Sequence, residues 1–165
     1  MIGNVDFAPT MLELAGVTTP DYMQGRSFAA AIRGEDKPAD WPTAAYYRYW
    51  MHMAPGHNNP AHFGIRTSDY KLIFFYGTDY TNYRALKMDY ATNFGGNRYG
   101  FNTPPAWELY DLKKDPGEMK NVYADPAYAD VVARLKKELH LMRQKLNETD
   151  NDYPRVQKVI DQYWD

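Results

Sequence analysis

Residues 63–76 read FGIRTSDYKLIFFY, and this stretch decides the fold. Its two halves, 63–67 and 70–76, are rich in aromatic and β-branched side chains, which favour strands. Ser68 and Asp69 stand between the halves and are typical of a tight turn. The stretch therefore predicts an antiparallel β-hairpin.

Two further strands and a long helix are predicted around this hairpin. Residues 43–50 precede it, and residues 107–112 follow it after a long stretch, 77–105, rich in Gly, Asn, Thr and Tyr. Asp125-Pro126 is typical of a helix start, and apolar residues then recur at helical spacing to about Asn147. The pattern predicts an α+β fold, a small four-stranded antiparallel sheet packed by a long C-terminal helix.

The first 42 residues predict helices that precede this sheet. Phe7, Met11 and Leu14 form one apolar stripe of a first helix that ends at Gly16. Ser27 is expected to cap a second, short helix, with Phe28 and Ile32 facing inward. A helix of about ten residues is marginal alone, so the first stripe is expected to lie on another element.

Composition excludes several classes of function. The 165 residues contain no cysteine, so disulfides and thiolate metal sites are excluded within this chain. The formal net charge is -2, and no apolar run approaches the roughly 20 residues of a membrane span, so neither nucleic acid nor membrane is expected as a partner. Aromatic residues make up 16%, which suits either an aromatic sheet core or a half-wet surface that holds sugars.

Several short segments, in this order, resemble one known family. They are NVDFAPTMLELAG (4–16), MQGRSF (23–28), GIRT (64–67) with YKLI (70–73), WELYDL (107–112), and DPGE (115–118) with Asn121. Together they are similar to the C-terminal portion of type I, formylglycine-dependent sulfatases of the alkaline phosphatase superfamily, including bacterial N-sulfoglucosamine sulfohydrolase-like and arylsulfatase-like proteins. The resemblance covers about residues 4–147.

The resemblance implies an organisation of the chain as part of an α/β parent. Residues 1–42 would end the catalytic domain, residues 43–147 would form the C-terminal subdomain with an insert at 77–105, and residues 148–165 would be a helical tail. The N-terminal catalytic domain would be the missing partner. Such parents are often periplasmic or secreted.

The resemblance also implies hydrolysis of a sulfate ester, with a formylglycine nucleophile made from Cys or Ser and a calcium ion. The sequence has no Cys, no Ser-x-Pro/Ala-x-Arg motif and no calcium-loop spacing. We therefore assign no catalytic residue, metal ligand or cofactor to this chain, and expect it to be inactive alone. Calcium and formylglycine are expected in the parent enzyme.

Candidate substrate-binding residues gather before the hairpin, where three histidines fall within eleven residues. The resemblance places a histidine against the substrate at His62, with His57 and Asn59 next, then His52 and Arg66. Imidazoles exchange hydrogen bonds with hydroxyls, and a charged one attracts sulfate. The alternatives are structural loop residues and, for Arg66, an ion pair to the catalytic domain. The histidine spacing fits no helical zinc pair.

Two functions remain open. One is a sulfatase part that contacts a sulfated small molecule or glycan. The other is a stand-alone binding or interaction module that has lost catalysis. Self-association through exposed apolar surface is expected if a covering domain is absent. The basic residues of the long helix could bind sulfated glycans or simply form a solvated face; they are Arg134, Lys136, Lys137, Arg143 and Lys145.

Overall fold

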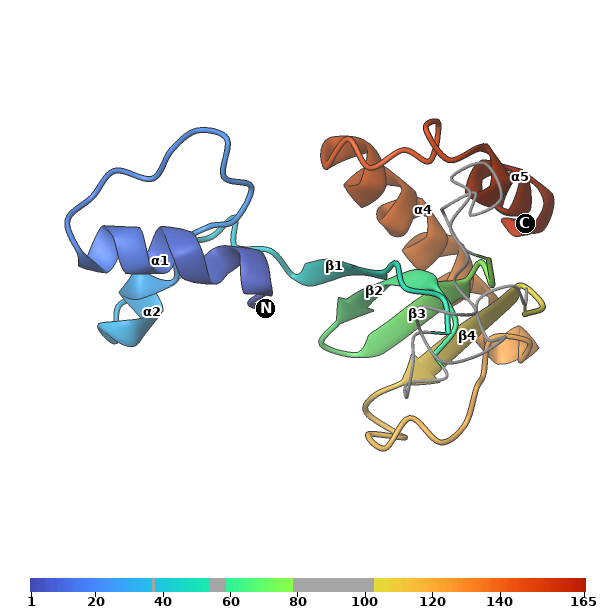
Figure 1. Ribbon diagram of the computed structural model, residues 1–165. Coiled ribbons are helices and arrows are strands. Elements are labelled where there is room, and N and C mark those ends of the chain that lie inside the picture. Colours follow the sequence, from blue (N-terminus) through green and yellow to red (C-terminus); the bar gives the residue numbers. More distant parts are fainter. Residues whose placement is uncertain (37, 54–58, 79–102) are drawn as a thin grey trace. The chain divides into compact units, whose positions relative to one another are not determined.

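The computed structural model describes residues 1–36, 38–53, 59–78 and 103–165 (Figure 1). Contacts divide the chain into two compact units, Met1–Ala45 and Tyr46–Asp165. The described elements in chain order are η1 (Asn4–Asp6), α1 (Phe7–Leu14), α2 (Ala29–Ile32), β1 (Ala44–Tyr49), β2 (His62–Thr67), β3 (Tyr70–Phe75), β4 (Ala106–Asp111), η3 (Pro126–Tyr128), α4 (Ala129–Lys145) and α5 (Pro154–Tyr163).

The sheet has the strand order β1-β2-β3-β4 and is antiparallel at the β2–β3 and β3–β4 pairs. His62 pairs with Phe75, and Arg66 pairs with Lys71. At the predicted turn, the Thr67 hydroxyl accepts the amide of Tyr70 at 2.9 Å and closes the hairpin. The predicted α+β fold, a small antiparallel sheet with a long C-terminal helix, is confirmed.

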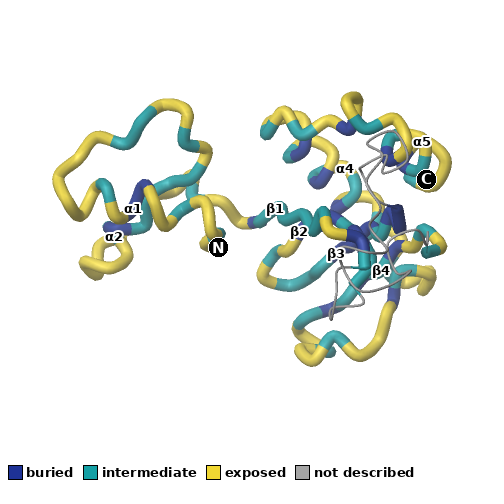
Figure 2. The backbone as a smooth tube through the Cα atoms, viewed as in Figure 1, coloured by how far each residue is buried: buried dark blue, intermediate teal, exposed yellow. Residues whose placement is uncertain are grey.

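One face of the sheet forms the core of the second unit. Phe63 and Ile65 of β2 and Phe74 of β3 are fully buried, as are Leu135 and Leu139 on α4. Figure 1 shows α4 beside the sheet, and its contacts are with β2 and β3. Figure 2 shows the buried segments concentrated in the strands and on the inner side of α4. Burial of this apolar face is the main force that holds the helix on the sheet.

Residues 148–165 pack into the same core. Val156 and Ile160 of α5 are buried, and the Trp164 ring lies 5.2 Å from that of Trp107. The Trp107 indole nitrogen also donates to the carbonyl of Tyr163 at 2.9 Å. This segment, expected to be a helical tail, therefore contributes side chains to the core of the second unit.

A group of two arginines and two acidic side chains, largely buried, joins β1 to the chain after α4. Arg48 of β1 donates to Asp150 at 2.6 Å and lies 3.3 Å from Glu148. Arg143 of α4 bonds the second oxygen of Asp150 and lies 3.7 Å from Glu148. We name these four residues the buried charge cluster. Its presence corrects one expectation, because Arg143 is buried by its acidic partners and does not lie on the solvated basic face of the helix.

The first unit is held by hydrogen bonds between α1 and the segment before α2. The Thr10 hydroxyl donates to the carbonyl of Asp6 at 2.6 Å and accepts the amide of Phe28 at 3.0 Å. The Asp6 carboxylate accepts the amide of Arg26 at 2.8 Å. Ile32 was expected to face inward and is 57% exposed, so that prediction is wrong. A helix of four residues, Ala29–Ile32, is too short to bury a full apolar face.

The predicted stripe of α1 is exposed. Phe7, Met11 and Leu14 are 50%, 66% and 53% exposed, while Pro9 and Thr10 are the buried residues of the helix. None of the described helices is both long and apolar enough to cross a membrane.

Candidate functional site

The candidate site lies on the second face of the sheet, opposite the core. Residues two apart in a strand share a face, and the register brings their neighbours beside them. We name this surface the outer sheet face and define it by Tyr47, Tyr49, His62, Gly64, Arg66, Lys71 and Phe75. Two of the predicted substrate-binding residues, His62 and Arg66, lie on it.

His62 is held in one orientation by aromatic rings from β1 and β3 and by the backbone of the residues that precede it. Its ring stacks on Tyr49 with centroids 5.5 Å apart, and the Phe75 ring lies 4.9 Å away. The ring nitrogen Nδ1 lies 2.7 Å from the carbonyl oxygen of Pro60. A carbonyl only accepts, so Nδ1 carries the proton. In the neutral ring, Nε2 is then left as a hydrogen-bond acceptor.

The charge state of His62 follows from its surroundings. Partial burial is the main factor that lowers the pKa of its imidazole, and the positive charge of Lys71 lowers it further. The hydrogen bond to Pro60 and the negative charge of Glu108 raise the pKa, but they do not outweigh the burial. The ring is therefore neutral at pH 7. Such a histidine recognises a hydroxyl or N–H donor and does not act as a cation for sulfate.

Tyr47 lies across the strand at Gly64. An ideal Cβ at Gly64 would fall 2.5 Å from the Leu72 carbonyl oxygen and 2.6 Å from the Tyr47 hydroxyl oxygen, so only glycine leaves room for both. That oxygen is buried and has no hydrogen-bond partner among the described residues. Burial raises the pKa of Tyr47, so the hydroxyl keeps its proton as a donor. The alternation of Tyr47 and Tyr49 predicts a shared face, whereas the role of Gly64 was missed, although glycine within a strand often marks a close approach.

Arg66 forms its ion pair inside the second unit. Its guanidinium lies 3.6 Å from one oxygen of Glu118, and the Lys71 ammonium lies 2.5 Å from the other. The Arg66 side chain is 52% exposed. The ion pair expected as the alternative for Arg66 was to the catalytic domain, whereas the acid that Arg66 meets here comes from the turn after β4 in its own unit.

The remaining predicted residues lie apart from the outer sheet face or outside the described chain. His52 is 2% exposed, and its Nδ1 accepts the amide of Ala61 at 3.1 Å, so it braces the loop against β2. Asn59 is half-buried, and its carbonyl accepts the amide of Met53 at 2.9 Å. His57 lies outside the described residues.

The comparison with known families identifies the chain. It matches the family described as N-sulphoglucosamine sulphohydrolase, C-terminal, over residues 1–93 and 97–145. The chain belongs to this family. The resemblance to the C-terminal part of sulfatases is thereby confirmed.

Individual relatives of the chain are also sulfatases by name. The chain is 40% identical over 151 residues to N-acetylglucosamine-6-O-sulfatase of Bacteroides thetaiotaomicron, a match of 91% of this chain and 21% of that protein. It is 29% identical over 152 residues to Delta 4,5-hexuronate-2-O-sulfatase of the same organism, with 90% and 24% covered. The chain thus spans about a fifth to a quarter of the length of these curated relatives.

Solved structures share the fold. One is a protein in complex with its substrate D-glucosamine-2-N,6-O-disulfate, with a TM-score of 0.67 at 36% identity over 91% of this chain and 25% of that one. Another is a 2-O glycosaminoglycan sulfatase, with a TM-score of 0.60 at 25% identity over 87% of this chain and 25% of that one.

The residues of this chain do not fit the two groups that sulfatases use for chemistry. The sequence has no cysteine and no Ser-x-Pro/Ala-x-Arg motif from which formylglycine could be made. Within the part of the chain that the structure describes, no three His, Asp or Glu side chains could hold a metal ion together. No catalytic step is therefore derived through either group.

Proposed function

We propose that this chain is the substrate-contacting C-terminal part of a sulfatase that hydrolyses a sulfate ester on a saccharide. Membership of the N-sulphoglucosamine sulphohydrolase C-terminal family supports the class of enzyme. The names of relatives that act on N-acetylglucosamine-6-O-sulfate and hexuronate-2-O-sulfate groups support the saccharide. The observation that carries the role of this chain is the single orientation of His62 on the outer sheet face.

His62 would contact the sugar through Nε2. This nitrogen accepts a hydrogen bond, and the ring is fixed by Pro60, Tyr49 and Phe75, so little side-chain entropy is lost when a ligand binds. Because a neutral imidazole nitrogen accepts from an O–H group, this contact suits a hydroxyl group of a sugar.

The chemical step would come from a catalytic domain supplied by the same parent protein. There a formylglycine would attack sulfur and a divalent cation would hold the sulfate oxygens, as the family resemblance implies. The apolar stripe of α1 (Phe7, Met11, Leu14) is the surface we propose for contact with that domain, because it is at least half exposed. Without that cover, the isolated chain is expected to self-associate, which light scattering after size exclusion would measure. A strictly monomeric chain would contradict this part of the proposal.

The decisive experiment uses the product of the complete reading frame and sulfate release from N-acetylglucosamine-6-sulfate. His62→Ala should lower kcat/KM by about tenfold, the worth of one hydrogen bond of roughly 1–1.5 kcal/mol, while His62→Gln should restore part of it. His140→Ala is the control, since His140 is an exposed histidine on α4. Equal rates for His62→Ala and His140→Ala would show that His62 does not contact the substrate.

A stand-alone binding module is the alternative. It predicts that the reading frame around this chain encodes no Cys/Ser-x-Pro/Ala-x-Arg motif and that the full product releases no sulfate.

A further inference from the structure

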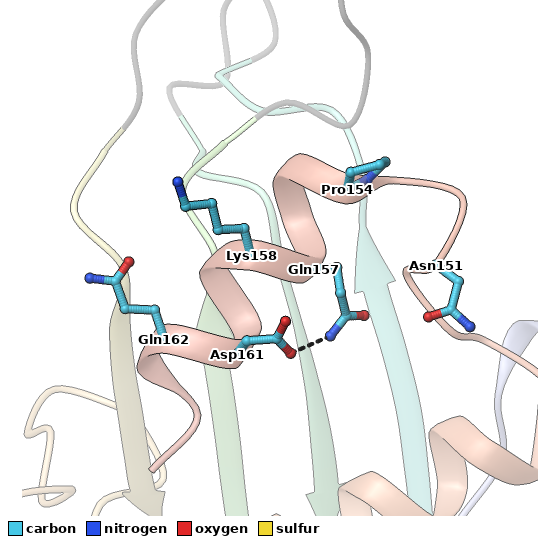
Figure 3. Close-up of a pocket in the computed structure, with 6 residues that line it drawn as sticks. All are labelled: Asn151, Pro154, Gln157, Lys158, Asp161 and Gln162. Atoms are coloured by element: carbon cyan, nitrogen blue, oxygen red, sulfur yellow. Dashed lines mark hydrogen bonds between the residues drawn. The ribbon is translucent and has the colours of Figure 1, made fainter.

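A hollow lies between α5 and residues 76–78 and 103–105. Its volume is about 410 Å³, within the range of about 300–1,000 Å³ typical of small-ligand sites. One wall is a single face of α5, because Arg155, Lys158 and Gln162 are spaced three and four residues apart. Figure 3 shows an adjoining pocket on α5, in which Lys158 and Gln162 also take part, together with the bonded pair Gln157 and Asp161. None of the lining residues belongs to the outer sheet face.

The lining of this hollow is positively charged. Its described lining contains two cationic side chains, Arg155 and Lys158, and no carboxylate. The hydrogen bond of Arg155 goes to the Thr78 hydroxyl at 3.3 Å, and neither cation forms a salt bridge to an acid within the described ranges. The whole chain carries a formal charge of -2, so the positive charge of these described lining residues departs from the average of the molecule.

Two threonines form the opposite wall. Thr78 is 4% exposed and its hydroxyl accepts the hydrogen bond of Arg155, while Thr103 is half-buried with its hydroxyl against Gly77. The amide of Thr103 donates to the carbonyl of Gly77 at 2.8 Å, and this bond fixes the wall. Gly77 has a φ of 61°, which glycine adopts without strain. The charged groups available to a ligand are therefore Arg155 and Lys158, which suit an anion with several oxygens.

The hollow also offers an aromatic surface. Tyr163 lines it and is 41% exposed, while its backbone is held by the bond to Trp107. A tyrosine ring presents a flat apolar body and a polar tip, which suits one face of a sugar ring. The volume accommodates more than an isolated oxyanion.

We propose that this hollow is a second carbohydrate site, which binds a sulfate-bearing saccharide unit through Arg155 and Lys158, with the sugar ring against Tyr163. The choice of a sulfated sugar rests on the function proposed above. The site itself rests on the charge, the aromatic surface and the shape of the hollow. It would hold a sugar unit of a longer substrate apart from the one at His62.

The test is a titration of the 165-residue chain with D-glucosamine-2-N,6-O-disulfate, unsulfated glucosamine and inorganic sulfate. Calorimetry gives the affinities, and NMR shifts of the threonine and arginine signals locate the ligand. The disulfate should bind, glucosamine should not, and inorganic sulfate should bind at least tenfold more weakly than the disulfate. The double variant Arg155→Gln, Lys158→Gln should lower the affinity for the disulfate by about tenfold or more.

The matched control is Lys137→Gln, Lys145→Gln, which removes two exposed charges from α4. It should leave the affinity within about twofold. Loss of binding in this control but not in the α5 variant would overturn the proposal in favour of the basic face of α4. Equal affinities for inorganic sulfate and the disulfate would also overturn it, because the hollow would then bind anions without recognising the sugar. His62→Ala should leave the NMR shifts at Arg155 and Thr78 unchanged, so failure at His62 and failure at this hollow are distinguishable. Because Arg155 and Lys158 are exposed, their replacement should not disturb folding. The NMR shifts also locate the ligand in the unaltered chain, so the test does not depend on the variants alone.

Discussion

Replacing Asp150 by asparagine should destabilise the second unit more than any surface change of the same kind. Asp150 is fully buried, and its two oxygens bond the guanidinium groups of Arg48 and Arg143. The variant keeps the shape of the side chain and removes its charge. Two buried cations would then be left beside Glu148, whose contacts are longer, 3.3 and 3.7 Å, and whose pKa, raised to about 8, leaves it mostly protonated at pH 7.

The expected cost is set by the burial of the charges. Breaking a buried ion pair by removing one partner costs about 3–5 kcal/mol, because the other charge stays desolvated. Whole domains are stable by only about 5–15 kcal/mol, so the variant would lose a large part of the total. With a urea m-value of about 2 kcal/mol/M, the unfolding midpoint should fall by about 2 M.

Urea unfolding followed by near-ultraviolet circular dichroism is a suitable assay, since the packed rings of Trp107 and Trp164 belong to this unit. Asp69→Asn is the control, because Asp69 pairs with Lys113 at 2.8 Å on the surface, where such pairs contribute about 0–1 kcal/mol. A midpoint for Asp150→Asn within about 0.5 M of the control would refute the reasoning that the buried charge cluster stabilises the fold.

Three further outcomes are expected. Gly64→Ala should lower the free energy of unfolding by about 1–3 kcal/mol, because the new Cβ meets the Leu72 carbonyl oxygen at 2.5 Å and the Tyr47 hydroxyl at 2.6 Å. Adding Tyr47→Ala should remove only the second clash, so the double variant should not regain the stability of the parent chain. Burial and the charge of Asp150 raise the pKa of Glu148 from its ordinary 4.5 to about 8, so the folded state holds this proton more tightly than the unfolded state. The free energy of unfolding should therefore fall as pH rises from about 4.5 to 8. Glu148→Gln should flatten that slope when unfolding by urea is measured at several pH values. The NMR titration of His62 should have its midpoint below the ordinary 6.5. Because the folded state disfavours the charged ring, the free energy of unfolding should decrease as pH falls through that midpoint. A midpoint above 6.5 would contradict a neutral acceptor.

The strands could be predicted from the sequence because each is marked locally. The stretch 63–76 combines aromatic runs with a two-residue turn, and the structure places β2 and β3 within one residue of the expected bounds. The long helix was equally visible from its cap and its apolar spacing. Asp125 accepts the amide of Ala127 at 2.9 Å, although the first turn is a 3-10 helix.

What could not be predicted depends on contacts distant in the sequence. Arg48 and Asp150 are 102 residues apart, and nothing local distinguishes them from exposed charges. The orientation of His62 likewise depends on a backbone carbonyl two residues earlier and on rings from two other strands. Periodicity also fails for Ile32, because spacing alone does not say whether a short helix has a surface to bury.

The buried charge cluster sets an order of events during synthesis. Arg48 cannot be neutralised until residues 148–150 have left the ribosome, about 100 residues later, which at roughly 5–20 residues per second is several seconds or more. Until then the nascent sheet presents an unpaired cation and an apolar face that α5 and Trp164 will cover. A chaperone that shields this intermediate should raise the yield of native protein. Translation without pauses after the sheet has been synthesised should do the same.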